Sequence, residues 1–308
     1  MQLAQNASEK KALPYKLTRN WTNYLFLAPG VLFLIFFMVF PIIYNIVLSF
    51  QDVSLLNFKG VKHFIGLENY RTIFKDPVFF IALKNSVFFT VGCIFFQFSF
   101  GFAFALLFNM NFPGRNILRA LMILAWMLPG IISATLFKWI LSGDSGILNY
   151  FLQSLRIIDK PILWLTDTDT SLLGTMVANI WHGIPFNMLI LLGGLQSLPE
   201  QLFEASKLDG ASRYQRFVYI TLPLMRPTIL ILLMLGIIYA FKVFDLIFIM
   251  TAGGPVNSSF VLPFYAFNQT FVQMEFSLGG TVATLMLVFL SMVAVVYLWF
   301  LKKEEKVH

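Results

Sequence analysis

The chain alternates between long apolar runs and shorter polar segments. Six runs are apolar and long enough to cross the hydrocarbon core of a bilayer, which takes about 20 helical residues. They cover residues 24–49, 80–108, 117–141, 170–196, 224–250 and 278–301. Because a helix satisfies its own backbone hydrogen bonds in lipid, the pattern predicts an all-α, polytopic integral membrane protein with six transmembrane helices.

The first two runs contain small residues and prolines that interrupt the apolar pattern. The first run holds Pro29, Gly30 and Pro41, which a membrane helix tolerates where neighbouring groups bind the freed carbonyls. This run is too long for the core of a signal peptide, and no small-residue cleavage site follows it, so we expect it to remain as a span. In the second run, Gly101 and Ala105 are four residues apart, a spacing that predicts close approach of another helix.

The composition and the distribution of charge agree with a membrane protein. Of the 308 residues, 58% are hydrophobic and only 12% are charged, and the mean hydropathy is +0.77; a soluble domain could not cover such a composition with polar surface. The termini and the loops after the second and fourth runs hold 13 of the 22 Lys and Arg residues but only six of the 15 acids, which accounts for the whole net charge of +7. By the positive-inside rule these segments, both termini included, are cytoplasmic. The basic clusters therefore indicate topology and not a nucleic-acid-binding surface.

The most informative polar segment is Glu200–Pro227, between the fourth and fifth runs. Four of its apolar residues recur at helical spacing, namely Leu202, Ala205, Leu208 and Ala211. They predict a short helix with an apolar stripe. Gly210 tolerates the left-handed conformation that a helix end requires, so we expect two short helices around it. Such a loop presents a shaped surface to a partner in the water beside the membrane.

Residues of this segment match a known motif at fixed offsets. The motif runs Glu-Ala-Ala, a few residues, Gly, and further on Ile-x-Leu-Pro. The residues that fit it are Glu204, Ala205, Ser206, Asp209, Gly210, Ala211, Ile220, Leu222 and Pro223. The one departure is Ser206, where the motif usually has a second alanine of nearly the same size. In these residues the chain resembles the permease subunits of bacterial binding-protein-dependent ABC importers.

Segments outside the loop extend the resemblance to the carbohydrate branch of that family, the maltose and glycerol-phosphate type. These segments are Tyr24–Phe50, Phe64–Tyr70, Trp181–Leu198 and Phe244–Pro255. The resemblance thus covers nearly all of residues 22–300.

The resemblance implies a fold, partners and a location for the chain. It implies the type I ABC importer permease fold, with a transmembrane domain at 21–301, a core transport unit at about 80–300, a coupling loop at 198–226 and cytoplasmic tails at 1–20 and 302–308. It also implies ATP-binding ABC ATPase subunits, a second related permease in a heterodimer and an extracytoplasmic solute-binding protein. The chain would then be a multi-pass protein of the bacterial inner (cytoplasmic) membrane.

The same resemblance implies a function and roles within the loop. The chain would form the translocation path for a sugar or related polar solute delivered by the solute-binding protein. In the coupling loop, Glu204 would be the electrostatic contact with the ATPase and Gly210 the hinge. Closure of the ATPase dimer would then move the spans from an inward-facing to an outward-facing arrangement.

The sequence carries no signature of catalysis or of a cofactor. No G-x-x-x-x-G-K-[ST] phosphate loop is present, so we expect ATP hydrolysis on separate subunits and no enzymatic activity on this chain. His63, His182 and His308 are scattered, and Cys93 is the single cysteine, which argues against a metal site or a disulfide. The energy for uphill transport must come from another subunit or from an ion gradient. The alternative to an ATP-driven importer is therefore an ion-coupled secondary carrier.

Polar and aromatic residues inside the fourth and fifth runs are candidates for the solute path, because a polar group in a membrane is costly unless it is paired or faces water. The candidates are Asn179, His182, Asn187, Tyr239, Phe241, Lys242 and Asp245. Lys242 and Asp245 lie three residues apart in the fifth run, so we expect them to share one helix face and to be able to pair. They either line the outer part of the path or form a structural ion pair near the external interface, and in the carrier alternative they are the proton or sodium site. The aromatic candidates either stack on sugar rings or pack against neighbouring helices.

Overall fold

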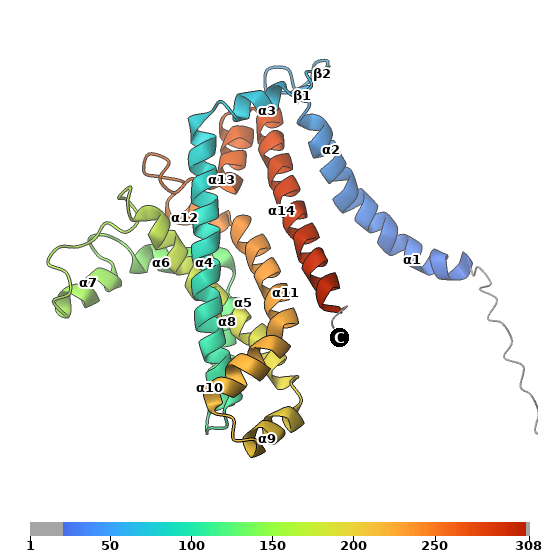
Figure 1. The fold of residues 1–308 in the computed structure, drawn as a ribbon. Coiled ribbons are helices and arrows are strands. Elements are labelled where there is room, and N and C mark those ends of the chain that lie inside the picture. The colour runs from blue at the N-terminus through green and yellow to red at the C-terminus, as the bar shows by residue number, and fades with distance from the viewer. Residues whose placement is uncertain (1–20, 306–308) are drawn as a thin grey trace, which may run out of the picture. The chain divides into compact units, whose positions relative to one another are not determined.

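The computed structural model describes residues 21–305 and is mostly helical (Figure 1). The only strands in this part of the chain are β1 (Gln51–Asp52) and β2 (His63–Phe64), which pair antiparallel with Gln51 opposite Phe64. The helices are α1 (Trp21–Leu34), α2 (Phe40–Leu48), α3 (Glu68–Ile73), α4 (Pro77–Asn109), α5 (Arg115–Met127), α6 (Gly130–Ile140), α7 (Ile147–Ser154), α8 (Ser171–Gln196), α9 (Glu200–Leu208), α10 (Arg213–Arg216), α11 (Leu222–Phe241), α12 (Asp245–Met250), α13 (Leu262–Phe267) and α14 (Phe276–Glu305). Three π-helical segments are inserted among them: η1 (Ile35–Val39), η2 (Phe217–Thr221) and η3 (Asn268–Val272).

The chain divides into two compact units, which separate after Asn45. The first unit contains α1, η1 and the start of α2, which follow one another directly. The helical run Phe26–Leu48, which extends three residues past this unit, is long and apolar enough to be a span. The π-helical turn η1 ends just before Pro41, whose ring nitrogen cannot donate a hydrogen bond. The predicted first span is therefore helical, and its π-helical irregularity falls just before Pro41, whereas Pro29 lies inside α1.

In the second unit, α4 packs against α8 over much of its length, and α11 lies beside α4. Small residues permit this close approach. A Cβ added at Gly101 would lie 2.6 Å from the Cβ of Asn187, and one added at Gly183 would lie 2.4 Å from the Gln97 side chain. The prediction that another helix approaches closely at Gly101 is confirmed.

The predicted third span is not one straight helix. The helices α5 and α6 meet at an angle of 96° across Leu128 and Pro129. Proline disfavours the helical conformation in the residue before it and has no N–H of its own, and Leu128 is accordingly extended, with ψ of 135°. Five helical runs in the described residues can cross a membrane by length and composition, and there are six if this bent pair counts as one span.

The predicted fifth span also differs from the sequence pattern. Helix continues without a gap from Arg213 through η2 into α11, so the run begins well before residue 224. It is then interrupted at residues 242–244, and α12 starts at Asp245. The negative charge of Asp245 is favoured in the first turn of a helix by the helix dipole.

The two ends of the second unit carry different structures. The helices α9 and α10 lie at one end, and α3 and α13 lie at the opposite end (Figure 1). At the latter end, the Asn85 side chain donates hydrogen bonds to the carbonyls of Ser258 and Phe260, at 3.0 and 2.9 Å, and Ser86 accepts one from the backbone N–H of Leu262 at 2.7 Å. These bonds fix the loop between α12 and α13 onto α4.

Candidate functional site

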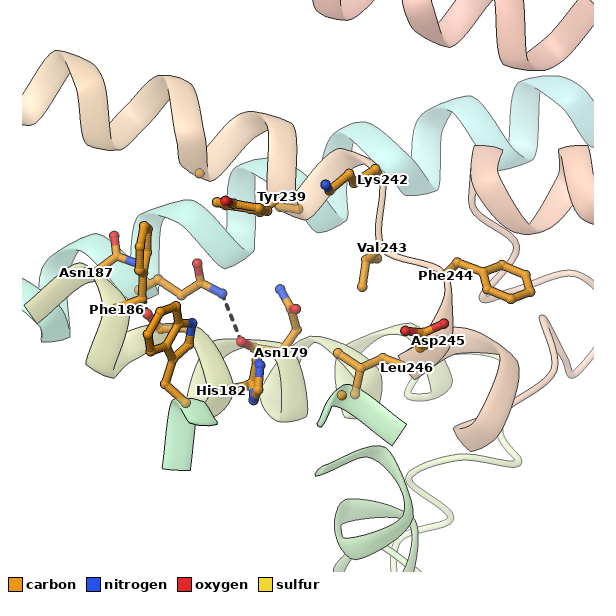
Figure 2. A pocket seen from close by; sticks show the side chains of 16 residues that line it. Asn179, His182, Phe186, Asn187, Tyr239, Lys242, Val243, Phe244, Asp245 and Leu246 are labelled. Carbon is orange, nitrogen blue, oxygen red and sulfur yellow. Dashed lines mark hydrogen bonds between the residues drawn. The ribbon is translucent and has the colours of Figure 1, made fainter. Parts of the chain in front are cut away.

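A cavity of about 450 Å³ lies within the second unit, among α4, α5, α6, α8, α11 and α12. Six of the seven candidates for the solute path line it, and Figure 2 shows them around one space. They are Asn179, His182, Asn187, Tyr239, Lys242 and Asp245. The fold thus brings together residues that are up to 66 positions apart in the sequence, from Asn179 to Asp245.

The polar residues of α8 are held by their neighbours. The Asn179 carbonyl accepts a hydrogen bond of 2.9 Å from the Gln97 amide of α4 (Figure 2). His182 Nδ1 and Ser133 Oγ of α6 share a hydrogen bond of 3.3 Å. The Asn187 amide donates to the carbonyl of Gly183 in its own helix, at 2.9 Å. The side chains of His182 and Asn187 are therefore held in place, whereas at Asn179 the bond is to the backbone carbonyl and holds the Gln97 side chain against α8.

Lys242 and Asp245 lie on different elements. Lys242 follows the last residue of α11, and its ammonium group is 5.0 Å from the centroid of the Tyr239 ring, a cation–π contact. In Figure 2 the Lys242 side chain extends toward Tyr239, whereas Asp245 lies at the start of α12. Within residues 21–305 no ion pair joins the two side chains. The prediction that they share one helix face is therefore wrong, because the helix is interrupted between them.

Asp245 lies near the beginning of a second helix. A Cβ added at Gly130, the first residue of α6, would be 3.8 Å from a carboxylate oxygen of Asp245. The carboxylate is thus close to the positive ends of both α12 and α6, which favour a negative charge. This arrangement accounts for the position of Asp245 without a lysine partner.

Phe241 does not join the other candidates. Its side chain is only 3% exposed and stacks on Phe289 of α14, with ring centroids 4.6 Å apart. It packs between helices on the side of α11 away from the cavity, so of the two interpretations of the aromatic candidates, packing holds for Phe241.

The polar segment between α8 and α11 has the predicted form of two short helices around a glycine. Gly210 has a φ of +77°, its N–H donates to the carbonyl of Lys207 at 3.1 Å, and the N–H of Ala211 donates to the carbonyl of Ser206 at 2.9 Å. These two bonds form a Schellman motif that ends α9. The next helix, α10, starts with a capping box between Ser212 and Gln215.

The outer surface of this loop leaves apolar groups exposed. Leu202 is 45% exposed, Leu208 is 90% exposed, and Tyr214 and Tyr219 are each 74% exposed. Ser206, at the position where the sequence departs from the motif, is buried and its hydroxyl donates to the carbonyl of Phe203 at 2.9 Å. The serine is thus accommodated on the inner face of α9 and does not alter the exposed surface.

The remaining motif residues lie in the same loop. Glu204 and Asp209 are exposed on α9 and at its end. Asp209, Gly210, Ala211 and Ile220 line a cleft of about 350 Å³ beside α10. Leu222 and Pro223 begin α11.

Comparison with known proteins decides the family. The sequence profile of the binding-protein-dependent transport system inner membrane components matches residues 97–302. The chain belongs to this family. It is therefore a multi-pass permease subunit of the inner membrane that works in an ABC importer, and it is not an enzyme, since ATP is hydrolysed on separate subunits.

Relatives over the whole chain agree with this assignment. The permease is 32% identical over 277 residues to the trehalose/maltose transport system permease protein of Thermococcus litoralis, covering 90% of this chain and 92% of the relative. It is 31% identical over 307 residues to the sulfoquinovosyl glycerol transport system permease protein of Agrobacterium fabrum, covering 96% and 97% of the two chains. The relatives give no support to the alternative of a secondary carrier.

Solved structures show the fold of the permease. A crystal structure of a bacterial ABC transporter that imports the acidic polysaccharide alginate matches with a TM-score of 0.77 at 22% identity, covering 91% of this chain and 96% of that one. A crystal structure of a bacterial alginate ABC transporter in complex with an alginate-pentasaccharide-bound periplasmic protein matches with the same TM-score of 0.77 at 23% identity. The type I ABC importer fold predicted from the sequence is confirmed.

The permease cavity is also lined by residues outside the list of candidates for the solute path. They are Gln97, Trp126, Gly130, Gly183, Phe186, Gly236, Ala240, Val243, Phe244 and Leu246. Gln97 could have been recognised as a polar residue in the middle of an apolar run. Trp126 and Phe186 lie with ring centroids 5.4 Å apart, and Phe186 meets Tyr239 edge to face at 5.9 Å. In sequence these rings do not differ from other packed aromatic residues.

The permease offers no group of three or more His, Cys, Asp or Glu side chains that could hold a metal ion, as far as residues 21–305 are concerned. Cys93 is a free, fully buried cysteine in α4. The chemistry of the site is therefore that of amides, aromatic rings and the two charged side chains already described.

Proposed function

We propose that this permease forms the membrane path for a sugar or a closely related polyhydroxylated solute. The cavity among α4, α8 and α11 is the observation that supports this proposal. Its volume, about 450 Å³, falls within the roughly 300–1,000 Å³ typical of small-molecule sites. Two of the relatives are named for the transport of trehalose/maltose and of sulfoquinovosyl glycerol.

The side chains of the cavity suit sugar chemistry. The amide groups of Gln97, Asn179 and Asn187 can donate to and accept from hydroxyl groups. The rings of Trp126, Phe186 and Tyr239 offer apolar faces on which a sugar ring can stack. His182 is bound to Ser133, Gln97 to the backbone carbonyl of Asn179, and Asn187 to the carbonyl of Gly183, so these side chains are held in place before the solute arrives.

The loop Glu200–Pro223 is the proposed contact with the ATPase. Glu204 and Asp209 supply exposed negative charge, and Leu202, Leu208 and Tyr214 supply exposed apolar surface. The Schellman motif at Gly210 fixes the angle between α9 and α10. When the ATPase dimer closes, this shaped surface would transmit the motion to α8 and α11 as a rigid-body rotation.

The proposed orientation has both termini in the cytoplasm. The surplus of Lys and Arg in the termini and in the loops after the second and fourth runs supports it. The proposed tails, 1–20 and 302–308, fall largely outside the described residues. The proposed transmembrane domain is 21–301, with its core transport unit at about 80–300 and the coupling loop at 198–226.

Charge reversal on the loop tests the proposal. We expect Glu204→Lys to abolish uptake and to weaken co-purification with the ATPase subunits, and Glu204→Gln to have a smaller effect of the same kind. Lys207→Gln is the matched control, since it removes one exposed charge from the same helix without touching the motif. Unchanged uptake and co-purification in Glu204→Lys, at a normal level of membrane protein, would refute the proposed role of the loop.

A further inference from the structure

A second polar cavity, of about 490 Å³, lies at the end of the second unit opposite the coupling loop. It is formed by the start of α4, by α13 and η3, and by the turns on either side of them. Its lining residues are Asp76, Val78, Asn257, Phe260, Tyr265, Asn268, Gln269, Gln273 and Glu275. In the orientation proposed above, this cavity is on the external face of the membrane.

The cavity carries a net negative charge. Its lining contains the carboxyl groups of Asp76 and Glu275 and contains no Lys, Arg or His. Asp76 accepts hydrogen bonds from the Val78 N–H at 2.8 Å and from the Tyr265 hydroxyl at 2.5 Å. Burial and the neighbouring Asp76 raise the pKa of Tyr265, so the phenol keeps its proton and its hydroxyl is the donor in the hydrogen bond to Asp76.

Several polar groups of the cavity have no partner in the described part of the chain. The Glu275 carboxylate is half-buried and makes no hydrogen bond or ion pair there. The side-chain amides of Asn257 and Asn268, which are half-buried, and of Gln273, which is exposed, also make no hydrogen bond there. Exposed polar groups can be satisfied by water, but a half-buried carboxylate surrounded by free amides in a cavity of this size is also arranged to accept several hydrogen bonds from one group.

We propose that this cavity, here called the acidic pocket, receives a Lys or Arg side chain of the solute-binding protein. The inference rests on the proposed function, because it requires the pocket to face that protein. A cation is favoured by charge complementarity with Asp76 and Glu275. The donors of an ammonium or guanidinium group also match the acceptors on offer, which are carboxylate and amide oxygens. A neutral sugar would gain nothing from the net negative charge.

The backbone around the acidic pocket holds these groups in fixed positions. Asn85 binds the loop carbonyls next to Asn257, the N–H of Gln273 donates to the carbonyl of Asn268, and the N–H of Glu275 donates to the carbonyl of Gln269. The last two bonds close the π-helical end η3. Because the walls of the pocket are already fixed, little conformational entropy of the permease is lost when a charged side chain binds there.

The test uses the complete transporter in liposomes, together with its solute-binding protein. The quantity measured is the concentration of binding protein that half-saturates the ATPase activity. Glu275→Gln keeps the size of the side chain and removes its charge, and we expect the half-saturating concentration to rise roughly three- to tenfold and to depend less on salt. Gln273→Glu adds a carboxylate to the acidic pocket and should lower that concentration. Asp159→Asn, which removes an exposed carboxylate remote from the lining in sequence, is the control and should leave it unchanged.

A photo-crosslinking residue at Asn268 identifies the occupant. We expect crosslinks to a peptide of the binding protein that contains Lys or Arg, and weaker crosslinking when that residue is replaced. Three results would overturn the assignment: unchanged half-saturation in both pocket variants, a change in maximal rate alone, or an effect that vanishes with a metal chelator. If the unmodified transporter were not stimulated by the binding protein at all, the proposed function itself would fail, and the pocket assignment with it.

Discussion

The backbone conformation of Gly210 predicts how replacing this glycine changes the stability of the C-terminal end of α9 in the coupling loop. Gly210 occupies the left-handed region, with φ of +77°, and a Cβ added to it would meet no other atom within 4 Å. Any cost of substitution there comes from the backbone and not from crowding. The three replacements Gly210→Asn, Gly210→Ala and Gly210→Pro therefore isolate the requirement for this conformation.

The structure ranks the three replacements. The left-handed conformation costs an ordinary L-residue about 1–2 kcal/mol, and asparagine tolerates it best. Gly210→Ala should therefore shift the local opening equilibrium of α9 about five- to thirtyfold, and Gly210→Asn considerably less. Proline fixes φ near −65° and removes the N–H that donates to Lys207, so Gly210→Pro should cost about 3 kcal/mol or more.

Hydrogen exchange of the α9 peptides in the purified protein measures these shifts. Amide exchange in Glu200–Leu208 should accelerate in the order Asn, Ala, Pro, and uptake should fall in the same order. Gly193→Ala is the control, because Gly193 lies in α8 and an added Cβ there also meets no atom within 4 Å. In the Gly193→Ala variant, the amides of α9 should exchange at the same rate as in the unmodified protein. If Gly210→Ala left α9 exchange unchanged, or Gly210→Asn were as damaging as Gly210→Pro, the loop would not depend on this conformation.

Three further predictions concern the membrane-spanning part and its topology. Gly101→Val should lower thermal stability by the equivalent of about 1–3 kcal/mol, because the new side chain collides with α8; an unchanged melting temperature would contradict the packing of α4 on α8. In a double-mutant cycle, the effects of Lys242→Gln and Asp245→Asn on uptake should be additive within about 0.5 kcal/mol, because no ion pair joins these residues, and a coupling above about 1 kcal/mol would argue for one. In a cysteine-free background, an impermeant thiol reagent applied to intact cells should label Asp167→Cys and spare Ser212→Cys; labelling of the latter would place the coupling loop outside the cell.

The loop around Gly210 could be predicted from the sequence because its signals are local. A glycine after an apolar stripe specifies a helix end through its own backbone, and the Schellman bonds of Gly210 and Ala211 involve only residues of the same segment. The close approach at Gly101 could be predicted for a similar reason, since the absence of a side chain is visible in the sequence. In both cases the prediction depends only on residues that are close together in the sequence.

The breaks in the third and fifth runs show where sequence reasoning was insufficient. Pro129 was visible, but hydrophobicity alone does not say whether a proline bends a span slightly or by 96°. The interruption at residues 242–244 has no proline or glycine to mark it. It depends on α12 packing against α6, a contact between elements more than 100 residues apart.

The lining of the cavity could be predicted only in part, because some of its residues carry a local signal in the sequence and others do not. Asn179, His182 and Asn187 were recognisable because polar residues are rare inside apolar runs. Phe241 is a candidate because an aromatic ring can stack on a sugar, but the neighbouring helices decide which side of α11 faces the cavity, and Phe241 lies on the other side. Gln97 was overlooked although it carries the same kind of signal.

Uptake by membrane vesicles tests the central claim that this permease works in an ATP-driven importer. Vesicles containing the complete transporter, its solute-binding protein and ATP are measured after the proton and sodium gradients have been collapsed. The account predicts that uptake persists under these conditions, stops when ATP is withdrawn, and is absent in Gly210→Pro although the protein is inserted normally. Uptake that disappears with the gradients and continues without ATP would contradict the account and favour ion coupling.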